Sequence, residues 1–296
     1  MMFYLAGSIV LTSYLTLAFK VLEKFRINPF HAIVFNYCTC VITGSIVNNE
    51  FPVHTSTTHE AWFKWALLMG CMFISIFSLL GITTQKAGVA VASVANKLSL
   101  IIPFIFSIYL YNEHVTALRI LGIITALIAV ILTCWPSGKN VRDADSRKNA
   151  SLWLFLLPAL LFCSSGLLDT SIKYVEQVFL NEENKNAYLI TAFAVAASIG
   201  LMLIAILVAA KQQKFSYKSI IAGICIGIPN YFSLWCLVKV LKRNAGNSSA
   251  VIPINNMGIV LFSSLVAWIL FKEKLSLINW LGILLSIVAI ALTAFG

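Results

Sequence analysis

The sequence predicts an all-α polytopic membrane protein with ten transmembrane helices arranged as a 5+5 inverted repeat. Its composition, its apolar segments and an internal repeat each point to this fold class. Of the 296 residues 60% are hydrophobic and only 11% are charged, and the mean hydropathy is +0.91. Soluble chains are usually about 45–50% apolar and about 25% charged. We therefore expect most of the chain to lie in the hydrocarbon of a bilayer.

Ten apolar segments are long enough to cross a membrane, since a spanning helix takes about 20 mostly apolar residues. Their residues are continuously apolar, whereas barrel strands alternate, so the segments are expected to be helices. The first is interpreted as a spanning helix because it lacks the basic start and small-residue cleavage site of a signal peptide. The segments are 3–22, 29–47, 62–84, 88–111, 116–136, 151–173, 187–210, 217–239, 247–271 and 276–295.

A segment near the middle of the chain, residues 88–135, recurs within 246–295 at the C-terminal end with a shift of 160 and no gap. The conserved spacing of polar and glycine residues is harder to obtain by accident than matches between apolar residues. The matched pairs are Asn96 and Asn256, Glu113 and Glu273, Leu121-Gly122 and Leu281-Gly282, and Leu132-Thr133 and Leu292-Thr293.

The repeat divides the chain into a first half, residues 1–136, a charged linker, 137–150, and a second half, 151–296. Five helices in each half would place the halves in opposite orientations in the membrane. Inverted repeats of this kind are typical of secondary transporters that work by alternating access.

The net charge of +10 comes from Lys and Arg in the loops between apolar segments. There they set topology and contact anionic lipid headgroups, so a nucleic-acid partner is not expected. Counted by loop, these residues predict that both termini lie outside the cytoplasm. The seven Cys lie in apolar segments without the spacing of a zinc site, and His54 and His59 have no convincing metal spacing either. We expect no metal, no cofactor and no disulfide framework.

The order Val89-Ala-Val-Ala-Ser93, Pro103, Glu113 and Leu121-Gly122 resembles the EamA-type members of the drug/metabolite transporter superfamily. The second half follows the pattern with Ser248-Ser-Ala-Val251, Glu273 and Leu281-Gly282, but Ser263 stands where a second proline is usual and Pro253 lies opposite Ser93. Around Asn36-Tyr37 a basic residue common in the family's second helix is replaced. The resemblance implies secondary transport, often export, of small metabolites, with both termini in the cytoplasm, contrary to the loop charges.

Lys97 is the foremost substrate-binding candidate because ionisable groups within a bilayer are costly and usually functional. Ser93, four residues earlier, shares its helical face, and Asn96 precedes it. An ammonium at this depth could hold a substrate carboxylate. Alternatively, the helix starts later and Lys97 extends to the membrane interface.

Asn256, with Asn255 beside it, is expected to face Asn96 across a central cavity. The alternative is that these amides only join helices, a contribution of about 0.6 kcal/mol on average. Asn230 and Tyr231, which follow Pro229, and Tyr14 are weaker substrate-binding candidates; the simpler interpretation of Pro229 is a tolerated kink.

Asp169 is the candidate coupling residue, as a carboxylate that could take up and release a proton. The simpler and favoured alternative is a neutral pair with Lys173, four residues later on the same helix. Glu113 and Glu273 are expected to cap the helix that follows each of them. Gly223 and Gly227 have the spacing of a glycine pair that packs two helices together.

These features favour a secondary transporter of a small organic molecule in the cytoplasmic membrane, with export favoured. A phosphate-binding loop of the GxxxxGK[ST] type is missing from the sequence, so a gradient would drive transport. A non-transporting membrane scaffold or subunit is the alternative; a membrane-embedded enzyme is less favoured because HExxH and GxSxG are missing too. The expected partners are the solute and the lipid bilayer, and a homodimer is left open.

Overall fold

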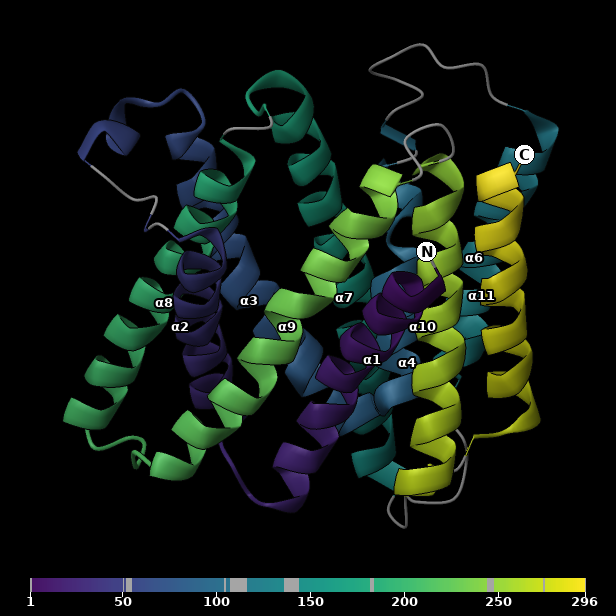
Figure 1. Ribbon diagram of the computed structural model, residues 1–296. Helices are drawn as coiled ribbons and strands as arrows, with labels where there is room; N and C mark the ends of the chain where they lie inside the picture. Colours follow the sequence, from purple (N-terminus) through teal and green to yellow (C-terminus); the bar gives the residue numbers. More distant parts are fainter. Residues whose placement is uncertain are drawn as a thin grey trace.

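The computed structural model describes residues 2–49, 51, 55–103, 105–106, 116–135, 144–181, 184–243, 248–273 and 275–295, and within these ranges it consists of helices and turns without a β-strand (Figure 1). The all-α class is therefore confirmed. The helices are α1 Met2–Lys24, α2 Pro29–Asn48, the 3₁₀ helix η1 Thr55–His59, α3 Phe63–Ala87, α4 Val89–Leu98, α6 Ala117–Thr133, α7 Ala144–Val178, α8 Lys185–Ala209, α9 Tyr217–Arg243, α10 Ser248–Phe271 and α11 Leu277–Phe295.

Each of the ten predicted segments overlaps a helix, and the polytopic membrane class is confirmed. Seven helices in the described residues are long and apolar enough to cross a bilayer, and three shorter apolar helices accompany them. The exact count of ten spans stays a prediction. The shorter three are Val89–Pro103, Ile120–Thr133 and Leu277–Leu292.

Helix α7 differs most from the predicted bounds. It begins at Ala144 and ends at Val178, whereas the sequence predicted a helix over 151–173 and a linker through residue 150. The hydropathy criterion detects only the membrane-embedded part of a helix, here Phe155–Glu176. The preceding residues, from Ala144 to Ala150, include strong helix formers, so the helix extends beyond the apolar segment.

The two halves pack with exchanged partners. α1 contacts α9 and α10 of the second half, and α7 contacts α3 and α4 of the first. In the same way α2 packs on α9 and α8 packs on α3. α6 and α11 lie side by side at one edge of the bundle in Figure 1, and α1, α4 and α10 lie between this pair and the α2–α8 edge. The helix contacts that the first half makes with the second are thus repeated with the two halves exchanged.

The α2–α9 contact depends on two glycines of α9. A Cβ atom at Gly223 would overlap Phe35, and one at Gly227 would overlap Thr39, so the two backbones approach as closely as only glycine permits. The predicted packing role of this glycine pair is confirmed.

Glu273 caps a helix, but not the helix that follows it, so that prediction was wrong. Its carboxylate accepts hydrogen bonds from the backbone N–H groups of Val89 at 2.8 Å and Ala90 at 3.5 Å, at the start of α4. A carboxylate there satisfies donors that the helix cannot and complements the positive end of its dipole. Gly88, at φ 99°, turns the chain between α3 and α4. Glu113 lies outside the described residues.

α11 has its own cap, which the sequence analysis missed. The Ser276 hydroxyl accepts from the Asn279 backbone N–H at 3.2 Å, and the Asn279 side-chain oxygen accepts from the Ser276 backbone N–H at 2.9 Å. This reciprocal pair is a capping box. The Asn279 amide also donates to the carbonyls of Thr133 and Trp135, each at 2.9 Å, and so ties the end of α6 to the start of α11.

Candidate functional site

A break in the fourth predicted span is the centre of the candidate site. The sequence predicted one helix over 88–111, but α4 ends at Leu98, Ser99 and Leu100 form a turn, and helical structure resumes at residue 101. Pro103 explains the break because proline has no N–H to donate to the carbonyl four residues earlier, and its ring crowds that carbonyl. The Ser99 carbonyl instead accepts from Ile102 N at 2.9 Å.

Ser99 links this break to α7. Its hydroxyl lies 2.6 Å from the Asn96 carbonyl and 3.3 Å from Asp169 Oδ2. The single hydroxyl proton is donated to one of these acceptors at a time, and the shorter distance favours the carbonyl. A Cβ atom at Gly166 would overlap Ile102, so α7 approaches the broken segment closely at this level. The break therefore lies directly against the second half of the chain.

Lys97 and Asp169 are the two ionisable groups at the break. They lie on α4 and α7, both side chains are half-buried, and their charges are close enough to attract each other. The sequence alone suggested Lys173 as the partner of Asp169. The structure adds Lys97 and Ser99, from a helix of the other half, as its neighbours.

The remaining candidates on α4 lie away from its most apolar face. Ala90, Val94 and Leu98 pack into a hydrophobic cluster with residues of α6, α10 and α11. Ser93 is buried, and its hydroxyl makes no hydrogen bond within the described structure. Asn96 is half-buried.

Helix α10, which packs against α4, carries the amides Asn255 and Asn256, both buried. The Asn255 side-chain oxygen has no hydrogen-bond partner among the described residues. A direct bond between Asn96 and Asn256 is not among the described contacts, so their arrangement across a cavity stays a prediction.

Helix α4 and the three helices that pack on it here, α1, α7 and α10, carry buried polar atoms that lack a protein partner in the described residues. Buried polar groups are hydrogen-bonded in the large majority of cases, so such a group of unpartnered atoms can bind water or a polar solute. Two of them, Ser93 and Asn255, were candidates from the sequence, whereas the serines of α1 and α7 and Ser264 were not. The set is Ser8, Ser93, Ser165, Asn255 and Ser264.

Asn230 and Tyr231 lie at the α2–α9 contact. Asn230 donates to the Asn36 side-chain oxygen at 3.1 Å, and the Tyr231 hydroxyl lies 3.5 Å from the Asn48 amide nitrogen. These bonds join two helices, in agreement with the alternative that such groups only connect spans.

Tyr14 lies in a separate place. It lines a groove between α1, α9 and the end of α10 that contains no other substrate-binding candidate. The structure therefore brings together Lys97, Asp169 and the α4 polar residues, with the α10 amides on an adjacent helix. Ser99 was missed, although its position four residues before a proline is a signal that could have identified it.

Comparison with known proteins supports this picture. Residues 151–295 match the sequence model of the EamA-like transporter family. An uncharacterised protein of Haemophilus influenzae is 25% identical over 278 residues, which make up 92% of this chain and 90% of that protein. A crystal structure at 14% identity has a TM-score of 0.62 and covers 99% of this chain and 96% of that chain, a likeness that shows the fold alone.

The family is one of membrane transporters, which agrees with the apolar helices and with the polar groups at the break after α4, where the two halves of the chain are in contact. Residues 151–295 contain α8–α11 and most of α7, so the match includes Asp169 and the α10 amides. The match over the second half of the chain to the EamA-like transporter family supports membership of the protein in the drug/metabolite transporter superfamily.

Proposed function

We propose that the protein is a secondary transporter that moves a small organic metabolite across the cytoplasmic membrane by alternating access, with export as the favoured direction. One observation carries this proposal: beside the break in α4, Lys97 lies near enough to Asp169 of the other half for their charges to interact. In transporters built from inverted repeats, solute and coupling ions bind at the repeat interface beside interrupted helices.

The proposed ten spans in two inverted halves are supported by the exchanged packing partners. α1 packs on α9 and α10, and its counterpart α7 packs on α3 and α4. An approximate two-fold axis in the membrane plane would generate this pattern from one five-helix unit. Rocking of one half against the other would then open the central helices to each side in turn.

We assign the main substrate contacts to α4 and α10. Lys97 would hold a carboxylate or another anionic group of the solute, and Ser93 and Asn96 would bind its polar atoms from the same helix. Asn255 and Asn256 would do so from α10. Asn230, Tyr231 and Tyr14 stay secondary candidates, since they lie at the α2–α9 contact and in a separate groove.

Asp169 is the proposed coupling group. Without solute, the Lys97 ammonium and the Asp169 carboxylate attract each other. An anionic solute group that binds Lys97 would compete for this cation, and Asp169 would then take a proton, since an unpaired carboxylate is costly away from water. A protonated Asp169 could donate that proton in a hydrogen bond to Ser99 Oγ, which lies 3.3 Å away. One anionic group and one proton would therefore move together, and export would be driven by the outward gradient of the solute itself.

The experiment is ligand-induced thermal stabilisation of the purified protein, followed by uptake of each hit into proteoliposomes. The panel contains amino acids, nucleobases, sugars, organic acids and cationic drugs. A ligand at 100 times its dissociation constant stabilises by about 2.7 kcal/mol. We expect a carboxylate-containing solute to stabilise the wild type and not Lys97→Met. Lys64→Met, at an exposed lysine of α3, is the matched control.

Each outcome has a distinct meaning. A hit that survives Lys97→Met keeps the transporter and removes Lys97 from the site. Binding without uptake into proteoliposomes contradicts transport. If the protein is folded but no solute stabilises it or is taken up into proteoliposomes, the non-transporting scaffold is favoured.

A further inference from the structure

A groove on the side of the bundle is not part of the main solute site proposed above. It lies between α1, α9 and the last residues of α10 and has a volume of about 590 Å³. That volume is in the range of about 300–1,000 Å³ that is usual for ligand sites. Its wall is apolar over most of its surface, with Val21, Ile221 and Ala222 among the residues that form it.

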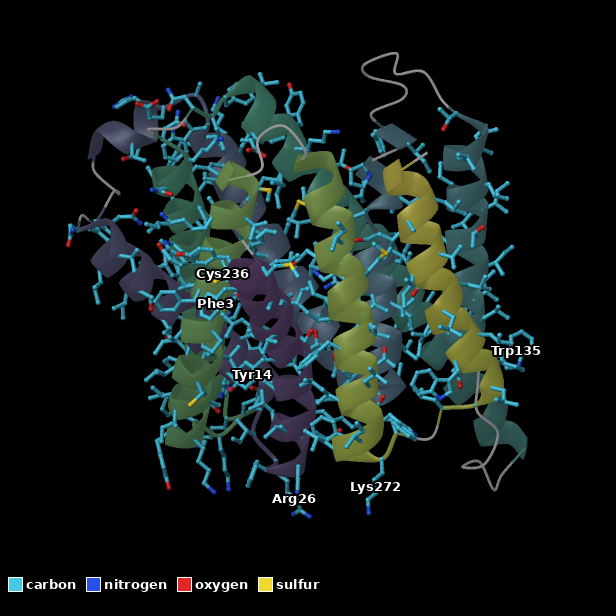
Figure 2. The ribbon with its side chains drawn as sticks, turned by 45° about the vertical axis from the view of Figure 1, so that its right-hand side comes forward. Phe3, Tyr14, Arg26, Trp135, Cys236 and Lys272 are labelled. Atoms are coloured by element: carbon cyan, nitrogen blue, oxygen red, sulfur yellow. The ribbon has the colours of Figure 1, made fainter. Side chains whose placement is uncertain are left out.

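The length of the groove matches one leaflet of a bilayer. Along α1 it extends from Tyr14 to Phe25, which at ~1.5 Å per residue is about 16 Å. The hydrocarbon core is about 30 Å thick, so this is close to half of it. Tyr14 lies at mid-height in Figure 2, and Arg26, next to Phe25, lies at the lower end of the bundle. The groove therefore extends from the middle of the membrane to one surface.

Basic residues surround the surface end of the groove. Lys218, in the first turn of α9, is one of its lining residues. Phe25 lies between Lys24 and Arg26, and the lining residue Phe271 is followed by Lys272. Arg26 and Lys272 both point away from the bundle at this end (Figure 2). Three segments of the chain thus bring cations to the same end.

The acidic residues nearest in the sequence are already engaged. Glu23 forms an ion pair of 2.7 Å with Lys20. The Glu273 carboxylate accepts from the backbone at the start of α4. Neither is a lining residue of the groove, so the cations there are available to an external anion.

We propose that this groove binds an anionic phospholipid, with one acyl chain along α1 and α9 and the phosphate beside Lys218, Arg26 and Lys272. The apolar wall accommodates the chain, and the length fits a single leaflet. The basic end distinguishes an anionic headgroup from a zwitterionic one. The site is independent of the break in α4 and of the main solute contacts proposed on α4 and α10.

The test uses two phospholipids with identical acyl chains, phosphatidylglycerol and phosphatidylcholine, each with a photoactivatable diazirine at the end of one chain. The full-length protein is reconstituted with each lipid and irradiated, and labelled peptides are identified by mass spectrometry. We expect labels on α1 and α9 near Tyr14 and Ile226, with phosphatidylglycerol the stronger. In Lys218→Gln this preference should fall roughly fivefold, the effect of one basic residue beside anionic headgroups.

Two kinds of variant control the result. Lys239→Gln removes an exposed lysine at the other end of α9 and should leave the preference unchanged. Ala222→Phe fills the groove wall, and Ile221→Trp does so at an exposed position where the larger side chain is accommodated more easily. Labelling by both lipids should be lost in the blocked variants that retain the wild-type unfolding temperature.

Equal labelling by the two lipids would overturn the proposal, as would labelling that persists in the blocked variants. Equal effects of Lys218→Gln and Lys239→Gln would show general surface charge instead of a site. Crosslinks between two copies of the chain at these peptides would assign the groove to a dimer contact.

Discussion

Helices α4 and α10 are counterparts in the repeat and pack against each other, yet only α4 is broken. Asn96 and Asn256 occupy equivalent positions, but Pro103 corresponds to Ser263 and Lys97 to Met257. α10 continues without a break from Ser248 to Phe271. The proline and the cation therefore occur together in one half and are both replaced in the other.

The difference shows that a repeat can be symmetric in packing and asymmetric in chemistry. Each packs on the first helix of the opposite half, α4 on α7 and α10 on α1. Of the two helices, only α4 combines an interrupted backbone with an ammonium group and a carboxylate nearby on α7. α10 contributes amides from an intact helix. Variants that exchange these properties test which of them the function requires.

The largest effect is expected from Asp169→Asn. The amide keeps the shape but removes the negative charge beside Lys97, so proton-driven accumulation should be lost while exchange of solute across the membrane persists. Stability should fall by at most about 3 kcal/mol, because one partner of a half-buried charge pair is removed. The measurement is uptake into proteoliposomes with and without a pH gradient. Glu176→Gln, at an exposed position of the same helix, is the control, and equal behaviour of the two variants would contradict the coupling role.

Exchanging the proline between α4 and α10 should give the second-largest effect. Ser263→Pro would remove a backbone hydrogen bond within α10 and should cost ~3 kcal/mol. Pro103→Ala should instead let the Ser99 carbonyl gain a donor, slow hydrogen exchange around the break, and reduce transport. Hydrogen-exchange mass spectrometry of both variants is the measurement. An unchanged exchange rate in Pro103→Ala would show that the proline does not cause the break.

Glu273→Ala should have the smallest effect, at the other end of α4. Loss of a helix cap costs about 1 kcal/mol, up to ~2. We expect faster hydrogen exchange at Val89 and Ala90, with α11 unaffected. Asn279→Ala is the matched control because it should loosen the start of α11 and the end of α6 instead. The assignment of the cap fails if Glu273→Ala accelerates exchange in α11 alone.

The sequence was sufficient to predict the helical membrane class and the approximate position of each apolar helix, because the apolar segments are long and few residues interrupt them. It was also sufficient to predict that Gly223 and Gly227 pack two helices together, although the partner helix α2 is known only from the structure. The target of Glu273 could not be predicted, since the residues that it caps lie 184 and 183 positions earlier and adjacency there depends on tertiary packing.

The start of α7 and the break after α4 differ in whether the sequence alone could have predicted them. Residues 144–150 are polar, so hydropathy excluded them although their helix propensity is good. The break follows from a local rule, since Pro103 disturbs the carbonyl of Ser99, and it could therefore have been predicted from the sequence. The proximity of Lys97 to Asp169 could not be predicted, because the two residues lie in different halves of the chain and only the fold brings them near each other.

The contact between α6 and α11 has a further consequence. Each is the last helix of its half, and each packs mainly on its own counterpart, with the Asn279 amide bonded across the contact. In a symmetric dimer the same surface of each subunit forms the contact in this way. The predicted inverted repeat would make this the contact of two copies of one ancestral subunit inserted in opposite directions, which the connection between the halves keeps within a single gene.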